Sequence, residues 1–146
     1  MRTGPALRQL HSHRSIHDAA YQEASEMTRV LEGLVRSGDH GRALEVAYVL
    51  VEQWETRTLR HAAAEEEGLY LEALQDNPSL SETIVQLKRD HDLLRTLLAS
   101  IQTELGQTGH ISADVLHRFY ALLAVVQFHS REEERHLIAK DGQNVP

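Results

Sequence analysis

The sequence predicts an all-α protein, an antiparallel up-down-up-down bundle of four helices. Three observations lead to this prediction. Apolar residues recur at alternating spacings of three and four along four long segments, the pattern of helices that pack in a bundle. The prolines, at positions 5, 78 and 146, all lie outside these segments. Short turn-forming stretches separate the segments, and short connections favour antiparallel neighbours.

The first predicted helix covers about residues 6–35 and the second about residues 42–74. Residues 37–41, Ser-Gly-Asp-His-Gly, separate them, and their glycines suit a helix C-terminus and a turn. Residues 75–79, Gln-Asp-Asn-Pro-Ser, end the second helix with strong turn chemistry. The first half of the chain therefore predicts one helical hairpin.

The third predicted helix covers about residues 80–105 and the fourth about residues 112–139. Residues 106–109 begin and end with glycine and are expected to form the turn between the third and fourth helices. Ser112 is a plausible N-cap for the last helix. Together the four helices predict a single domain over residues 1–146, a length that can bury a core without disulfides.

Composition narrows the classes of function. The chain has no cysteine, so any metal must be held by His, Asp or Glu, which points to iron, manganese, copper or zinc. A formal charge of −7 argues against nucleic acid as a partner. No segment approaches the roughly 20 apolar residues of a membrane span, and the N-terminal residues show no signal peptide. We therefore expect a soluble cytoplasmic protein; its protein partner is unknown.

The chemistry lies in two histidine–glutamate pairs. His61 and Glu65 are four residues apart on the second predicted helix, and His129 and Glu133 are four apart on the fourth. Residues at this spacing project from the same face of a helix. An imidazole beside a carboxylate forms half of a transition-metal site. Both pairs fall on the inward stripes of their helices, which favours a buried site over solvated pairs.

Histidines also interrupt the apolar stripes of the other two helices. His91 lies on the third stripe, and His13 and His17 lie one turn apart on the first. At 1.5 Å per residue, all these side chains fall roughly 10 to 20 Å from the same end of an antiparallel bundle. Burying such groups without partners costs a few kcal/mol each, so a shared ligand is expected.

The size of this set predicts two metal ions. Four imidazoles and two carboxylates exceed the needs of one tetrahedral zinc. Two octahedral ions fit better, with Glu65 and Glu133 spanning them. The terminal ligands would be one histidine from each helix: His13, His61, His91 and His129.

With this set of histidines and glutamates, the chain resembles the hemerythrin-like family, whose members carry HHE cation-binding domains. The resemblance covers about residues 6–139, and four segments carry it: 13–16, 61–70, 88–94 and 129–134. It implies a non-haem centre of two iron ions, bridged by an oxo or hydroxo group. Such a centre binds or reacts with a small ligand, either a diatomic molecule (O₂ or NO) or peroxide. The functions that this implies are sensing, iron handling or redox defence.

Two departures separate the chain from oxygen-carrying members. Leu87 stands where the carriers have a further histidine one turn before the third-helix ligand. The carriers also have an aspartate five residues after the fourth-helix histidine, whereas this chain has Glu133 at four residues and Glu134 at five. Tyr70 stands where many members have phenylalanine. The resemblance is thus closer to the sensor, iron-handling and redox branches. With Leu87 in place of a nitrogen ligand, one iron is expected to carry an exchangeable position.

Several alternatives stay open at this stage. His13 is the better match on the first helix, and His17 is an added ligand, an outer partner of the ligands or a core residue. Glu66 can join the ligands or face solvent, and Tyr70 can approach the edge of the site. His136 can be a surface or gate residue near the mouth of the site. Three classes of function remain. The first is a di-iron binding or sensing protein, with reversible O₂ or NO binding and iron storage as variants. The others are a redox enzyme that consumes peroxide or NO, and a structural bundle that binds metal adventitiously.

Overall fold

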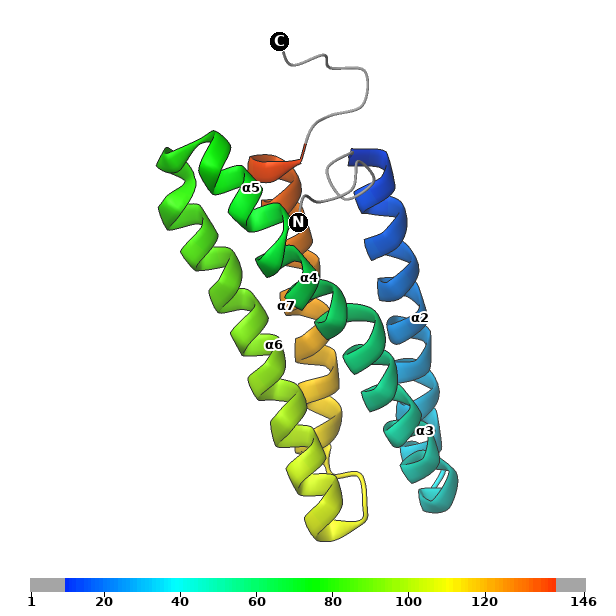
Figure 1. Cartoon of the computed structure of the whole chain (residues 1–146). Coiled ribbons are helices and arrows are strands. Elements are labelled where there is room, and N and C mark those ends of the chain that lie inside the picture. Colours follow the sequence, from blue (N-terminus) through cyan, green and yellow to red (C-terminus); the bar gives the residue numbers. More distant parts are fainter. Residues whose placement is uncertain (1–9, 139–146) are drawn as a thin grey trace.

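The computed structural model describes residues 10–138, and this part of the chain forms an antiparallel bundle with four helical arms, as predicted (Figure 1). In Figure 1 the arms run side by side, with the α2–α3 and α6–α7 turns at one end. No strand occurs among the described residues. The elements are α2 (Leu10–Arg36), α3 (His40–Gln53), η1 (Trp54–Leu59), α4 (Arg60–Glu67), α5 (Leu69–Asp76), η2 (Pro78–Leu80), α6 (Ser81–Thr108) and α7 (Ala113–Leu137).

The second arm is more broken than the single helix predicted over residues 42–74. It consists of α3, the π-helical turn η1, α4 and α5. Single π-helical turns inside α-helices add a residue to the turn and occur often at functional sites. Here the π-helical turn ends at Leu59, two residues before His61. A second irregularity lies at Gly68, with φ −116° and ψ −81°, between α4 and α5.

The ends of the other arms follow local signals. Gly109 adopts a left-handed conformation with φ 65° and ends α6, three residues beyond the predicted end. Gly106 does not break α6, because packing of the buried Ile101 and Leu105 outweighs its cost of about 1 kcal/mol. The Ser112 hydroxyl accepts a hydrogen bond of 3.1 Å from the Val115 N–H and caps α7. The predicted helical residues 6–9 and 139 lie outside the described part.

Two apolar clusters make up the core. The larger one surrounds Trp54 and Phe119, and the smaller one surrounds Leu69 and Leu87. Along α6, His91 lies between Leu87 of the smaller cluster and Leu94 of the larger one. His129 and Glu133 lie in the same way between the two clusters along α7. The candidate ligands therefore form a polar layer enclosed by apolar packing on both sides.

Within the described residues, no helix is both long enough and apolar enough to cross a membrane.

Candidate metal centre

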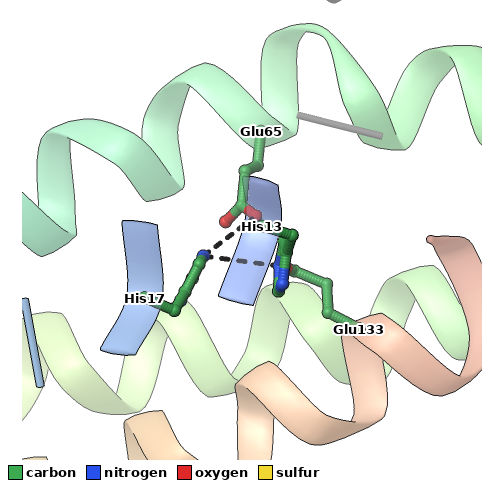
Figure 2. Close-up of side chains that lie close together, drawn as sticks. All are labelled: His13, His17, Glu65 and Glu133. Carbon is green, nitrogen blue, oxygen red and sulfur yellow. Dashed lines mark hydrogen bonds and ion pairs between the residues drawn. The ribbon is translucent and has the colours of Figure 1, made fainter. Parts of the chain in front are cut away.

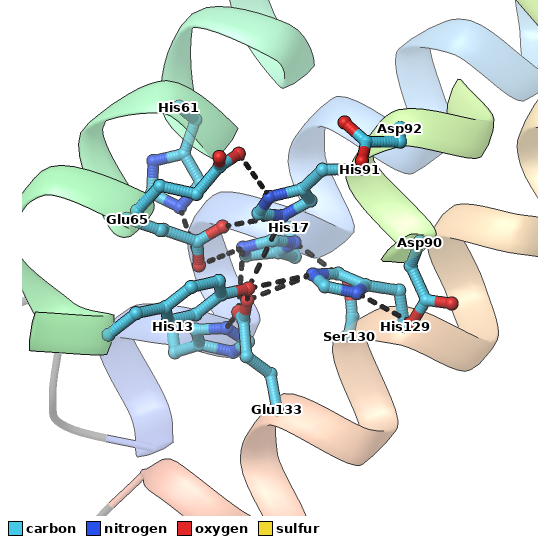
Figure 3. A network of polar contacts seen from close by, with 12 residues as sticks. His13, His17, His61, Glu65, Asp90, His91, Asp92, His129, Ser130 and Glu133 are labelled. Carbon is cyan, nitrogen blue, oxygen red and sulfur yellow. Dashed lines mark hydrogen bonds and ion pairs between the residues drawn. The ribbon is translucent and has the colours of Figure 1, made fainter. Parts of the chain in front are cut away.

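Five imidazoles and two carboxylates meet in this polar layer, and every arm of the bundle contributes (Figure 3). Five of the seven side chains are at most 2 % exposed, and only two of the histidines retain modest access to solvent. Every residue of the predicted primary ligand set is present. The members are His13 and His17 from α2, His61 and Glu65 from α4, His91 from α6, and His129 and Glu133 from α7.

The layer divides into two overlapping groups that could each hold an ion. The first subsite contains His13 and His17, and the second contains His91 and His129. Both subsites include Glu65 and Glu133, and within each group one ligand atom per residue lies within 4.8 Å of the others. Figure 2 shows the first subsite, with His17 directed toward both carboxylates. Two ions sharing both carboxylates fit this arrangement.

Glu133 directs one oxygen to each subsite. Its Oε1 lies 2.6 Å from Nε2 of His13, whereas its Oε2 lies 2.9 Å from Nε2 of His129. A carboxylate whose two oxygens face different imidazoles can bind one ion through each oxygen. The two oxygens of Glu133 are thus arranged as the predicted bridging position would require.

Glu65 is arranged in the same way. Its Oε2 lies 3.5 Å from Nε2 of His61 and 3.9 Å from Nε2 of His17. Its Oε1 lies 3.4 Å from Nε2 of His91 in the second subsite. His61 therefore lies beside the first subsite, next to the same Glu65 oxygen as His17, so three imidazoles lie at or beside this subsite where the second has two.

Several atoms of the first subsite have no hydrogen-bond partner although they are buried. They are both carboxylate oxygens of Glu65 and the Nε2 atoms of His17 and His61. Leaving buried polar atoms unpaired costs about 1–3 kcal/mol each. A cation in the first subsite would satisfy the two nitrogens and Oε2 of Glu65, and a cation in the second would satisfy Oε1, which faces His91. The residues present therefore fit a metal ion.

Three of the five imidazoles are held in the form that binds metal, whereas at His129 the effect of burial is outweighed by hydrogen bonds to Asp90 and Glu133, which raise its pKa to about 9. Burial, together with the neighbouring His13, lowers the pKa of His17 to about 3. Burial and the nearby His129 lower the pKa of His91 to about 4. Burial also lowers the pKa of His61. All three rings are thus neutral at physiological pH, as metal coordination requires.

The two shared carboxylates have opposite ionisation tendencies. Burial and the adjacent charge of Glu133 raise the pKa of Glu65 well above its usual value. Burial alone would raise the pKa of Glu133 too, but the neighbouring Glu65 carboxyl and hydrogen bonds to His129 and His13 hold it well below the usual range. Without a cation, Glu65 therefore retains a proton while Glu133 carries the charge.

Two ligands are oriented through their outer ring nitrogens by carboxylates. Glu66 Oε2 lies 2.8 Å from Nδ1 of His91 and also accepts a hydrogen bond of 2.6 Å from Arg95. Asp90 Oδ2 lies 2.9 Å from Nδ1 of His129. Such contacts fix the ring orientation and make the inner nitrogen a better donor to metal. Glu66, predicted either to join the ligands or to face solvent, instead supports His91.

The α2 ligands have outer partners as well. Nδ1 of His13 lies 3.3 Å from Glu134 Oε2, and Nδ1 of His17 lies 2.8 Å from the Ser130 hydroxyl. No such role was predicted for Glu134, Ser130 or Asp90. Each immediately neighbours a predicted ligand in the sequence, and a polar residue beside a predicted ligand was the only available signal.

We expect Asp90→Asn to weaken metal binding by about 10–100-fold, the usual effect of losing such an outer carboxylate. The amide cannot support the charge that develops on His129 when its Nε2 binds an ion. Competition with a chromophoric chelator measures the affinity. Asp92→Asn is the matched control, because Asp92 is 60 % exposed and contacts Arg95 rather than a candidate ligand. Equal affinities of the two variants would contradict this role for Asp90.

Tyr70 reaches deeper into the layer than its predicted position at the site edge. Its hydroxyl donates a hydrogen bond of 2.5 Å to Oε2 of Glu133. The same oxygen lies 3.3 Å from Nε2 of both His91 and His129. Burial and the charge of Glu133 raise the pKa of Tyr70, so without a cation the phenol stays protonated.

The structure does not bring His136 to either subsite. Its side chain is 37 % exposed and its Nε2 lies 3.2 Å from Glu132 on the same helix. It belongs to the surface of α7.

A cavity of about 380 Å³ reaches the layer from outside. Its lining includes His17, His61 and Glu65, together with apolar side chains such as Trp54 and Val126. A small molecule can therefore approach the first subsite without displacing the bundle.

A family model described as Hemerythrin HHE cation binding domain matches residues 14–140. The matched range contains six of the seven candidate ligands, and His13 lies one residue before it. No curated protein and no solved structure matches the chain.

Proposed function

Because the chain belongs to the hemerythrin HHE cation-binding domain family, we propose that it binds two iron ions and uses them to bind or react with O₂, peroxide or NO. Sensing, iron handling and redox defence are the settings in which such chemistry serves a cell. The observation that carries the proposal is the pair of buried carboxylates, Glu65 and Glu133, each facing imidazoles of both subsites.

In this proposal the first ion is held by three imidazoles and the second by two, with both carboxylates shared. His17 is included because its Nε2 is buried, unpartnered and directed at both carboxylates. The predicted preference for His13 alone is thereby replaced by ligation through both histidines of α2. A set of nitrogen and oxygen donors of this size suits octahedral iron better than tetrahedral zinc.

The metal pair would supply electrons to, or take them from, a small oxidant or nitrogen oxide. The protein supplies five imidazoles, three of them with lowered pKa values, and an apolar enclosure on both sides of the layer. Its cavity supplies access. This access favours a function with an external ligand over a metal site that only stabilises the fold.

A redox enzyme that consumes peroxide or NO is the alternative within the same site, since the same ligands would serve it. The cavity of about 380 Å³ favours this alternative over storage of iron, because it provides room for a reactant beside His17 and His61. A structural bundle with adventitious metal is disfavoured by the burial of the ligand atoms.

The proposal is tested by optical spectroscopy of protein loaded anaerobically with iron(II). On exposure to O₂, we expect oxidation without reversible oxygen uptake, and we expect peroxide or NO to change the spectrum. The physical reason is that Leu87 provides no nitrogen ligand of the kind found in carriers. His117→Ala, at an exposed histidine of α7, is the control. Repeated cycling between deoxygenated and stable oxygenated spectra would contradict the consequence drawn from Leu87. No response to any of the three reagents would argue against the proposed function itself.

A further inference from the structure

We propose that Tyr70 is itself a metal ligand, with its phenolate oxygen bound to the ion of the second subsite. This inference rests on the proposed function, since it requires an ion beside His91 and His129. It assigns the tyrosine a direct bond to metal rather than a hydrogen bond at the edge of the site. It also identifies the second ion as an iron–phenolate centre.

The two subsites differ in their donors. Beyond the shared carboxylates, the first subsite has His13 and His17, with His61 beside it at Oε2 of Glu65, whereas the second has only His91 and His129. Leu87, one turn before His91, supplies no donor and packs in the smaller apolar cluster. The second subsite therefore lacks one terminal donor relative to the first.

The phenol oxygen of Tyr70 also lies close to the candidate ligand atoms of the second subsite. It lies within 3.3 Å of Nε2 of His91, Nε2 of His129 and Oε2 of Glu133. These are the three atoms that would face the second ion. A cation held by all three must lie next to the Tyr70 oxygen, which has lone pairs to offer it. No other described tyrosine makes such contacts.

The Tyr70 ring also has little room to move away from the second subsite. Tyr70 is 1 % exposed and packs with Leu69, Ile84 and Leu87 in the smaller apolar cluster. Its ring also stacks on His91, with centroids 5.5 Å apart and planes 10° from parallel. An ion entering the second subsite therefore meets a phenol that is fixed in place.

Ligation exchanges one bond for another without electron transfer. The O–H bond of Tyr70 breaks, an oxygen–metal bond forms, and the proton leaves to water. A nearby cation strongly favours the deprotonated form of a coordinating group. The exchange also frees Oε2 of Glu133 from the hydrogen bond that it now accepts, so this oxygen can bind the same ion.

A phenolate ligand would favour some of the family's activities over others. An anionic oxygen donor binds iron(III) more strongly than iron(II), since the attraction grows with the charge of the ion. Tyr70 would therefore stabilise the oxidised centre. Reversible oxygen carriage needs a readily restored iron(II) state, so this ligand favours redox defence or catalysis over carriage.

The inference is tested on the full chain loaded with iron and oxidised. A phenolate bound to iron(III) gives a charge-transfer band in the visible region, and resonance Raman excitation in that band enhances phenolate ring vibrations. We expect both signals in the unmodified protein and their loss in Tyr70→Phe, at an iron content of two or close to it. Tyr120→Phe is the matched control, because the Tyr120 hydroxyl donates to Glu32 instead.

The outcomes separate this inference from the function on which it rests. Two bound irons without phenolate signals in the unmodified protein would overturn the ligand role of Tyr70 and leave the dimetal site intact. Signals that persist in Tyr70→Phe would overturn it as well. Failure of the unmodified protein to bind iron would overturn both proposals. If Tyr70→Phe does not fold, ring-deuterated tyrosine in the unmodified protein decides the matter by shifting, or failing to shift, the Raman bands.

Discussion

Replacement of Glu133 by alanine is expected to abolish stable binding at both subsites, reducing the metal content from two ions per chain to less than one. Glu133 offers a different oxygen to each subsite, at 2.6 Å from His13 and 2.9 Å from His129. Its removal takes one anionic donor from each ion and leaves Glu65 as the only shared carboxylate. We expect an affinity loss of at least about 100-fold, beyond the range of an outer-partner substitution.

Metal analysis after gel filtration measures this effect. Glu132→Ala is the matched control, because Glu132 precedes Glu133 on α7 but is 45 % exposed and pairs with Arg135 and His136. The control should retain both ions. If Glu133→Ala loses one ion and keeps the other tightly bound, the carboxylate serves one subsite only, contrary to the shared geometry.

Metal loading is expected to raise the melting temperature substantially. The metal-free layer contains unpartnered atoms of His17, His61 and Glu65, and an ion would satisfy them. A ligand present at a thousand times its dissociation constant stabilises the folded state by about 4 kcal/mol. For a domain of this size, each kcal/mol raises the melting temperature by roughly 2–4 °C, so a single ion should raise it by roughly 10 °C.

Thermal unfolding followed by circular dichroism compares chelated protein with protein reloaded with iron(II) under anaerobic conditions. Magnesium, added at the same concentration, is the control for non-specific ionic effects, because it prefers oxygen ligands and retains its water. Equal melting temperatures for the metal-free and iron-loaded forms would show that the layer is not completed by metal.

Helical spacing explains why the side chains that meet in the polar layer could be predicted. His61 with Glu65 and His129 with Glu133 share helix faces by their separation alone, and depth along the arms brought His91 to the same layer. The four arms were predictable for the same reason, since apolar periodicity and turn residues are local signals.

What sequence spacing could not provide is the rotation of one helix against another. Asp90 and Ser130 orient ligands on other helices, across the α6–α7 and α7–α2 interfaces, and only the packed bundle shows which ring each one meets. His17 was ambiguous for the same reason. The π-helical turn at Trp54–Leu59 depends on backbone hydrogen bonding, which apolar periodicity does not report. Tyr70 reaches the layer through α5, which begins anew after Gly68.

In our proposal, the polar layer between the two apolar clusters holds two ions through the shared carboxylates of Glu65 and Glu133. Anaerobic titration of the metal-free chain with iron(II), followed by metal analysis, tests this claim most directly. We expect saturation at two irons per chain that remain bound through gel filtration. A single tightly held zinc, or no retained metal after reconstitution with iron, would contradict it.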